Sequence, residues 1–337
     1  MNVNQGDMHV TNFKRTRRDI GRIGVAALMT AATGGVLAQA YPNRNVKLII
    51  SYPAGGPSDM TGRAIARGMA AEFGQPVVVE NRAGVSGLIG LETLTNSPPD
   101  GYTIMLLNNT TTTALLGQQK PLDIDKRMTT VGHFVGVRML LVVNPKVIDV
   151  KDIAGLVNHA RRSPEPLQYT TSGPGSPSQV VMEAFAIQEK FKAEHIPYKG
   201  SQPALLDTVA GRIPVMLAEA STAIEHIRSG SLRPLGTVSP GRTSLLPDLK
   251  TSAEQGYPDF MFDLWFGIIA PPGTPWPLLQ RIRTALRAAV QSEDFMTLMR
   301  KSGNSVEYVD GPEYRARLIK DFDRWGQLIR STGISIN

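Results

Sequence analysis

The sequence contains no cysteine in its 337 residues. This absence excludes disulfide bonds, thiol catalysis and metal sites built from cysteine. Histidine is scarce as well, with five in the chain. The histidines after residue 40 form no i, i+4 pair and have no acidic ligand at metal spacing: His133, His159, His195 and His226. We therefore expect no metal and no other cofactor.

The chain also lacks a run of about 20 apolar residues, the length that a membrane-spanning helix needs. The mildly apolar residues 23–36 are interrupted by threonine and glycine. They follow the paired Arg17-Arg18 and precede Ala38-Gln39-Ala40, a small-x-small cleavage pattern. We interpret residues 1–40 as a signal peptide cleaved after Ala40, with a membrane anchor as the alternative. The paired arginines favour the twin-arginine route and leave ordinary secretion open.

No long run of one charge sign occurs. The chain has 36 basic and 29 acidic residues, and without residues 1–40 it has 31 basic and 27 acidic residues, a net charge of +4. This excess is spread along the chain, without the interleaving of basic and aromatic residues that is typical of nucleic-acid binders. We expect no nucleic-acid partner.

The most informative stretch follows the apolar run 46–50 and contains Gly55, Gly56, Pro57, Ser58 and Asp59. The pattern predicts a buried strand, a glycine turn and a helix that begins at the proline. Bare backbone at the positive end of a helix is a binding site for a carboxylate or phosphate. The alternative is that the two glycines only permit a tight turn.

Short apolar runs at 77–79 and 102–107, with a helical segment between them, predict a parallel sheet covered by helices. The polar, hydroxyl-rich segment 108–113 follows the third of these strands, and we expect it to be a loop. In open α/β sheets ligands bind beyond the carboxyl ends of strands. Asn109 and Thr110 are therefore predicted to share a cleft with the Gly55-Gly56 turn.

A second unit of the same kind occurs about 120 residues later. A predicted strand at 167–171 leads into Ser172-Gly173-Pro174-Gly175, and then Ser176 and Pro177 suit the start of a helix. Two such units favour anion binding over two unrelated tight turns.

About 300 residues remain after residue 40, the size at which a single core divides. We predict an α/β protein of two lobes, each a mainly parallel sheet flanked by helices, with the ligand cleft between them. The crossing strands are predicted at 139–143 and 262–269. The first lobe then comprises residues 41–140 and 265–337, and the second comprises residues 141–264.

Catalytic motifs are missing. Residues 84–87 are one residue short of a Gly-x-Ser-x-Gly elbow, and no glycine loop ends in Gly-Lys-Ser/Thr. We therefore expect a binding protein and not an enzyme. A secreted α/β hydrolase or lyase is the alternative from another class.

Seven motifs together resemble the Bug-type extracytoplasmic receptors of tripartite tricarboxylate transporters. The resemblance covers residues 41–337, and its most specific part is the string from Gly74 to Arg82. The motifs are Tyr41-Pro42, Ala54-Gly55-Gly56-Pro57-Ser58-Asp59, Gly74-Gln75-Pro76-Val77-Val78-Val79-Glu80-Asn81-Arg82, Pro99-Asp100-Gly101-Tyr102-Thr103, Pro197-Tyr198-Lys199-Gly200, Trp265-Phe266-Gly267 and Ala270-Pro271-Pro272-Gly273-Thr274-Pro275.

The resemblance implies a monomeric periplasmic binding protein that closes on a small carboxylate: a di- or tricarboxylate, an aromatic carboxylate or an amino acid. It implies delivery to a membrane permease of one large and one small subunit. A sensor subunit that presents its ligand to a signalling receptor is the alternative. Motif and resemblance together give the predicted ligand-binding residues: Gly55, Gly56, Pro57, Ser58, Asp59, Asn109, Thr110, Thr171, Ser172, Gly173, Ser176, Tyr198 and Glu219.

This chain departs from the family pattern at three places. Gln179 stands where the family usually has histidine, and Leu217-Ala218-Glu219 stands where it usually has Phe-Asp-Asn. The segment 108–112 is also more polar than the family pattern. Glu219 in the cleft would repel a second carboxylate or attract a ligand cation, and Asp59 is a second candidate partner for a ligand ammonium.

Overall fold

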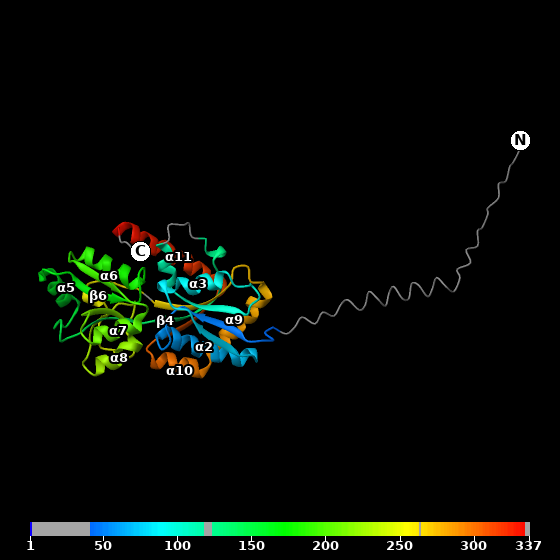
Figure 1. Ribbon diagram of the computed structural model, residues 1–337, viewed down its shortest axis with the longest axis horizontal. Helices are drawn as coiled ribbons and strands as arrows, with labels where there is room; N and C mark the ends of the chain where they lie inside the picture. The colour runs from blue at the N-terminus through cyan, green and yellow to red at the C-terminus, as the bar shows by residue number, and fades with distance from the viewer. Residues whose placement is uncertain (2–40, 118–122, 263, 334–337) are drawn as a thin grey trace. The chain divides into compact units, whose positions relative to one another are not determined.

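The computed structural model describes residue 1 and residues 41–117, 123–262 and 264–333 (Figure 1). The chain divides into residues 1–41 and a compact unit, Pro42–Asn337, and the fold below is that of the second unit. The predicted signal peptide and its cleavage motif lie outside the described residues.

The first sheet has six strands, and its core strand β1 is buried because four of its five residues are apolar and covered on both faces. β1 runs parallel to β2 and β3, whereas β10 runs antiparallel to β3 and β4, and β11 runs antiparallel to β4. The strands, in spatial order, are β11 (Ser305–Asp310), β4 (Thr129–Val137), β10 (Leu264–Ala270), β3 (Thr103–Asn108), β1 (Val46–Ile50) and β2 (Val77–Asn81).

Helices from both ends of the chain cover this sheet, and together they form the first lobe (Figure 1). Ile49, Met105, Trp265 and Tyr314 belong to one of its core clusters. The helices are α2 (Pro57–Phe73), α3 (Leu88–Thr95), α4 (Asn109–Leu116), α9 (Trp276–Gln291), α10 (Glu293–Lys301) and α11 (Gly311–Thr332), with short 3-10 turns η1 (Val85–Gly87) and η2 (Ile124–Lys126).

The second sheet has five strands and, with its helices, forms the second lobe. Its strands, in spatial order, are β7 (Ala193–Pro197), β6 (Leu167–Thr171), β8 (Val215–Glu219), β5 (Met139–Val143) and β9 (Arg233–Thr237). Its helices are α5 (Ile153–Arg162), α6 (Pro177–Gln188), α7 (Ser201–Val209) and α8 (Ala220–Arg228).

The predicted two-lobed α/β class is confirmed. The sheets, however, are mixed and not mainly parallel. The reason is the same in both lobes: β10 enters the first sheet antiparallel to β3, and β5 enters the second antiparallel to β8. The strands of the first sheet come from residues 46–137 and 264–310, and those of the second from residues 139–237. The lobe boundaries at 140 and 264 stay a prediction.

Two segments differ from the sequence-based expectation. β4 was not predicted, because Gly132, His133 and Gly136 interrupt its apolar pattern. The segment 108–113 is not a loop but the start of α4. Asn108 caps this helix by accepting a hydrogen bond from the amide of Thr111 at 3.2 Å, which lets a polar sequence begin a helix.

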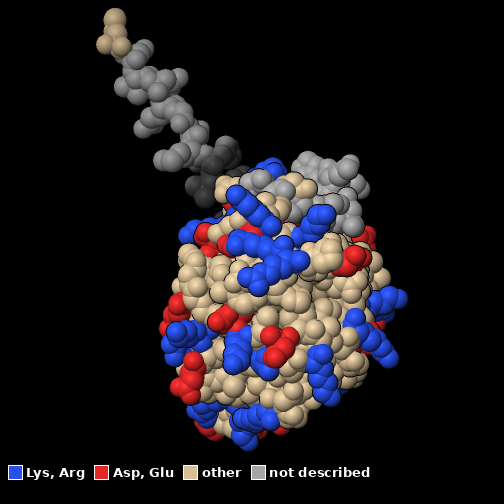
Figure 2. All heavy atoms as spheres, turned by 90° about the vertical axis from the view of Figure 1, so that its left-hand side faces the viewer, with Lys and Arg blue, Asp and Glu red and all other residues tan. Residues whose placement is uncertain are grey.

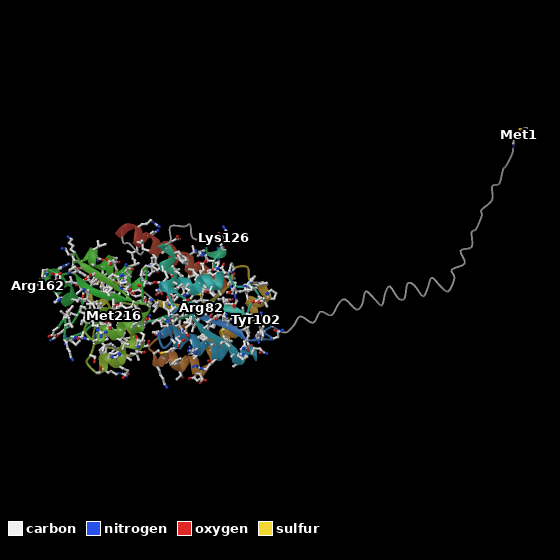
Figure 3. The ribbon with its side chains drawn as sticks, viewed as in Figure 1. Met1, Arg82, Tyr102, Lys126, Arg162 and Met216 are labelled. Atoms are coloured by element: carbon white, nitrogen blue, oxygen red, sulfur yellow. The ribbon has the colours of Figure 1, made fainter. Side chains whose placement is uncertain are left out.

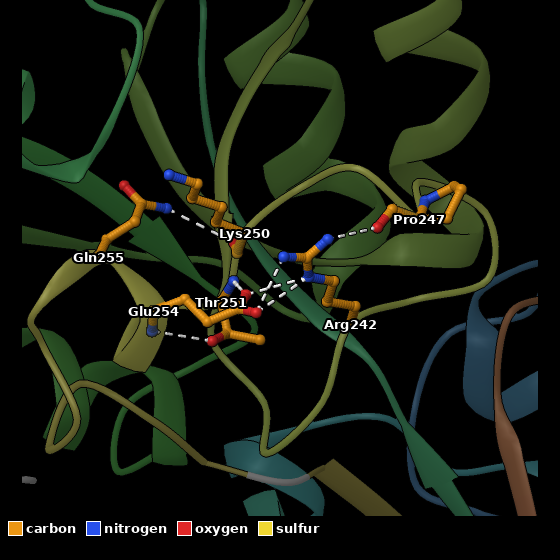
Figure 4. A network of polar contacts seen from close by, with 6 residues as sticks. All are labelled: Arg242, Pro247, Lys250, Thr251, Glu254 and Gln255. Carbon is orange, nitrogen blue, oxygen red and sulfur yellow. Dashed lines mark hydrogen bonds and ion pairs between the residues drawn. The ribbon is translucent and has the colours of Figure 1, made fainter.

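A polar network holds the segment between β9 and the 3-10 turn η3 (Ala253–Gln255) (Figure 4). The guanidinium of Arg242 donates to both carboxylate oxygens of Glu254 and to the carbonyl of Pro247. Glu254 in turn accepts from the amide of Thr251 at 2.7 Å. The network therefore fixes the segment that leads from β9 back toward β10.

Charges of both signs are interspersed on the face of the molecule shown in Figure 2. Several are paired within the second lobe, among them Arg161 with Glu189 and Arg233 with Asp149. Among the described residues, no helix is both long enough and apolar enough to cross a membrane.

Candidate ligand-binding site

A small cavity lies between the two lobes, and we call it the interlobe cavity. Its volume is about 30 Å³, room for no more than a few water molecules. Figure 3 labels one of its lining residues, Met216 of β8. The lining residues are Tyr52, Pro53, Gly56, Pro57, Ser58, Asn108, Thr110, Phe262 and Leu264, and, from β5 and the second lobe, Met139, Ser172, Pro177, Ser178, Gly200, Ser201, Gln202, Pro203, Met216, Leu217 and Glu219.

Five helices begin at this cavity: α2 and α4 from the first lobe, and α6, α7 and α8 from the second. The first amides of a helix have no partner within the helix, and the helix dipole places positive potential there. None of the described lining residues is Lys, Arg or His. The helix ends therefore supply positive potential to the cavity through backbone dipoles, without a cationic side chain among the described lining residues.

The Gly55-Gly56 turn at the start of α2 is held by Asp59. The Asp59 carboxylate accepts from the amide of Gly55 at 3.0 Å, from Arg63 Nε at 2.9 Å and from Asn81 Nδ2 at 3.0 Å. Burial raises the pKa of Asp59, but the hydrogen bonds from Arg63, Gly55 and Asn81 outweigh it and lower that pKa. Gly55 has a φ of 84°, which favours glycine. Asp59 thus shapes the turn and is not among the lining residues.

The glycine-rich loop of the second lobe is built in a similar way. Thr171 Oγ1 lies 2.7 Å from His195 Nε2 and accepts from the amide of Gly173 at 3.3 Å. Gln179 Oε1 accepts from the amide of Gly175 at 2.7 Å. Gln179 therefore fixes this loop from the first turn of α6.

Tyr52 connects the cavity to the start of α4. Its hydroxyl lies 2.9 Å from Asn108 Oδ1, the atom that caps α4, and 3.1 Å from Thr111 Oγ1. Burial raises the pKa of Tyr52 to about 12, so the phenol is neutral at physiological pH. The side chain thus forms a fixed wall of the cavity.

Glu219 lies at the end of β8 and is 5% exposed. Its Oε1 accepts a hydrogen bond from the Ser201 hydroxyl at 2.8 Å. Its Oε2 is buried and has no hydrogen-bond partner among the described residues. Burial raises the pKa of Glu219, and the hydrogen bonds around it oppose this shift only in part.

The two lobes touch beside the cavity. Ser86 Oγ of the first lobe donates to the carbonyl of Pro174 in the second. Val85 and Ser86 have φ values of 46° and 51°, a strained region for residues with a side chain. A Cβ atom on Gly173 would lie 2.5 Å from Ser86 Oγ. A side chain at position 173 would therefore displace the Ser86 hydroxyl from its hydrogen bond with Pro174.

Six of the thirteen predicted residues line the cavity: Gly56, Pro57, Ser58, Thr110, Ser172 and Glu219. The others lie behind it, where several shape the two loops: Gly55, Asp59, Asn109, Thr171, Gly173, Ser176 and Tyr198. Tyr198 donates to Asp207, and Ser176 caps α6 by accepting from the amide of Gln179. Contact with a ligand stays a prediction for all thirteen.

The start of α7 was not predicted to belong to the site. The signal was present in the turn Lys199-Gly200-Ser201, where Gly200 has a φ of 120° and precedes a helix. Four apolar residues of the lining had no sequence signal that distinguishes them from buried core residues: Met139, Met216, Phe262 and Leu264. In the described part of the chain, no cluster of His, Asp and Glu is arranged to hold a metal ion.

Two mixed sheets joined by crossing segments, with a cavity between them at helix N-termini, define a two-lobed binding protein. The chain belongs to the receptors of the tripartite tricarboxylate transporter family, whose model matches residues 61–334. The resemblance inferred from the motifs is therefore confirmed. Because this is a family of receptors, the prediction of a binding protein and not an enzyme is confirmed as well.

Individual relatives agree with this assignment. Protein BugT of Bordetella pertussis is 30% identical over 317 residues, covering 93% of this chain and 97% of BugT. An R. palustris protein solved with adipate is 28% identical, with a TM-score of 0.80, and the match covers 87% of this chain and 99% of that one. MatC from Rhodopseudomonas palustris, solved with bound malate, is 26% identical, with a TM-score of 0.78, over 86% of this chain and 100% of MatC.

Proposed function

We propose that this chain is an extracytoplasmic receptor that captures a small carboxylate in the interlobe cavity and delivers it to a membrane permease. The observation that supports carboxylate binding most strongly is the convergence of five helix N-termini on a cavity without a cationic side chain in its described lining. Helix N-termini bind anions through their first amides and their dipole.

The solved relatives support the same ligand class. The relatives named above were solved with malate and with adipate, both of them carboxylates. Transfer of this ligand class to the present chain is supported by the shared family and fold and by the anion-attracting cavity.

Delivery to a permease is supported by the family, which is described as the receptors of a tripartite tricarboxylate transporter. We propose one large and one small membrane subunit as the partners, and a receptor that acts as a monomer in the periplasm. The signal-peptide pattern that ends at Ala40 supports export.

Residues of both lobes enclose the interlobe cavity, whose volume is about 30 Å³. A ligand therefore enters it when the lobes separate and is held when they close again. We infer that the contact of Ser86 with Pro174 opens during entry and forms again around the bound ligand. Binding then involves a movement of one lobe relative to the other.

Calorimetry and thermal denaturation of residues 41–337 against a panel of mono-, di- and tricarboxylates and amino acids test this proposal. A ligand at one hundred times its dissociation constant adds about 2.7 kcal/mol of stability.

Gly56→Val places a side chain in the cavity lining and is expected to abolish binding without unfolding the protein. Gly241→Val is the matched control, because Gly241 lies outside the lining and its Cβ position would meet only the Arg138 guanidinium, at 3.9 Å. Absence of binding by every compound contradicts the proposal.

A further inference from the structure

Glu219 is the only carboxyl group among the described residues that line the interlobe cavity. It is 5% exposed, and one of its oxygens has a partner, the Ser201 hydroxyl at 2.8 Å. The other, Oε2, is buried without one. Buried polar atoms are nearly always hydrogen-bonded, so an orphan carboxylate oxygen in a ligand cavity marks a place where a donor is missing.

The contacts of Glu219 within the protein leave Oε2 without a partner among the described residues. Glu219 is the N-cap residue of α8, yet its carboxylate does not cap that helix. No Lys, Arg or His in the described lining neutralises it, and Tyr52 is the other titratable residue there.

We propose that the ligand is an amino carboxylate, whose carboxylate binds at the helix N-termini and whose ammonium group donates to Oε2 of Glu219. This inference rests on the proposed function and names the ligand class within it. An ammonium supplies both the missing donor and the missing positive charge. A plain dicarboxylate would instead place a second negative charge next to the buried carboxyl group, which is unfavourable unless Glu219 takes up a proton.

The test uses pairs of ligands that differ only in the amino group: aspartate with succinate, and glutamate with glutarate. Their dissociation constants are measured at pH 7.5 for the wild type, Glu219→Gln and the control Glu225→Gln, which changes an exposed residue of α8. The wild type and the control are expected to bind the better amino member at least 10-fold more tightly than its plain partner. Glu219→Gln is expected to lose most of this preference.

A second readout separates a ligand contact from a structural contact. If Oε2 of Glu219 binds the ligand, the unliganded Glu219→Gln variant is expected to have a melting temperature no lower than that of the wild type. The reason is that the substitution removes a buried carboxylate whose Oε2 has no partner. Should this variant fail to fold, Ser201→Ala, which removes the hydroxyl that holds Oε1, is expected to reduce the same preference while keeping the charge.

Three results would overturn the inference. One is an unchanged amino preference in Glu219→Gln. Another is a wild type that prefers the plain dicarboxylates and binds them more tightly as pH falls, which would make Glu219 a proton donor to the ligand. In both cases the carboxylate receptor itself stands. The third, no binding of any carboxylate to the wild type, overturns the proposed function and this inference together.

Discussion

Single glycine residues show how closely the two lobes must meet. Gly173 has a φ of 151°, and a Cβ there would lie 2.5 Å from Ser86 Oγ of the other lobe. Gly256 also has a positive φ, 91°, but open space surrounds its Cβ position. At both positions the backbone conformation would strain a residue with a side chain, but only Gly173 lies at the contact between the lobes.

Gly173→Ala is expected to lower ligand affinity at least 10-fold, because the added methyl group separates the lobes at the cavity. The backbone strain at either position costs about 1–3 kcal/mol of stability. Gly256→Ala, the control, should show the stability loss alone. Calorimetry and denaturant unfolding of both variants measure the difference, and equal affinities in the two variants contradict a closely approaching lobe contact.

Part of the residue-level site was predictable. The starts of α2 and α6 carry proline at the first helical position after glycine-rich turns, and Pro57 and Pro177 both line the cavity. Asp59 illustrates the limit. Its neighbours in sequence place it at the site, but its partner Asn81 comes from β2, and only the folded sheet shows that the carboxylate turns away from the cavity.

The short 3-10 turn η1 makes a direct contact between the two lobes. Its Ser86 donates to the carbonyl of Pro174, and its Val85 and Ser86 hold positive φ values. Strained backbone of this kind persists where the surrounding structure requires it. The segment is therefore expected to influence closure and not the stability of the sheets.

Ser86→Ala removes the hydrogen bond between the lobes. A neutral hydrogen bond contributes about 0.5–1.5 kcal/mol, so the ligand should bind about 2- to 13-fold more weakly, mainly through faster release. Stopped-flow measurements of dissociation test this, with Ser229→Ala on the exposed end of α8 as the control. If Ser86→Ala instead slows association of the ligand and leaves its dissociation rate unchanged, Ser86 acts before the two lobes close on the ligand.

The Arg242–Glu254 network is expected to make the segment after β9 sensitive to acid. Hydrogen bonds from Arg242 and from the amide of Thr251 lower the pKa of Glu254 to about 2. Because the folded-state pKa lies below the ordinary value of 4.5, this interaction stabilises the protein above about pH 4.5 and is lost as pH falls toward 2.

Glu254→Gln should therefore melt below the wild type at pH 6, with a difference that closes by about pH 2. The melting temperatures of both proteins across this range provide the measurement. Salt near 1 M should narrow the gap, since the pair is exposed and screened. A gap that is constant with pH would attribute the effect to packing and not to charge.

Elements with a clear apolar period were predicted well, and those without one were not. The strands expected at residues 46–50, 77–79 and 167–171 are β1, β2 and β6. β4 and α4 were missed, because glycine and histidine break the first pattern and four consecutive threonines hide the second. In both cases burial between neighbouring elements decided the structure, and a linear pattern does not contain that information.

The whole molecule combines the receptor family, the two-lobed fold and the interlobe cavity. Two lobes present five helix N-termini to one small space, and a carboxyl group within that space lacks a donor. The sequence predicted the two lobes and two of the five helix ends. It did not show that α7 and α8 begin at the same cavity, because this depends on the order β7-β6-β8-β5-β9 of the second sheet.

The most direct test of the central claim is a crystal structure of residues 41–337 with the tightest carboxylate from the binding screen. We predict a ligand in the interlobe cavity with its carboxylate oxygens at hydrogen-bond distance from the first amides of α2 and α6, near Ser58 and Ser178. A ligand bound instead in the larger cavity of about 530 Å³ that His133, Arg138 and Tyr314 help to line would contradict the account.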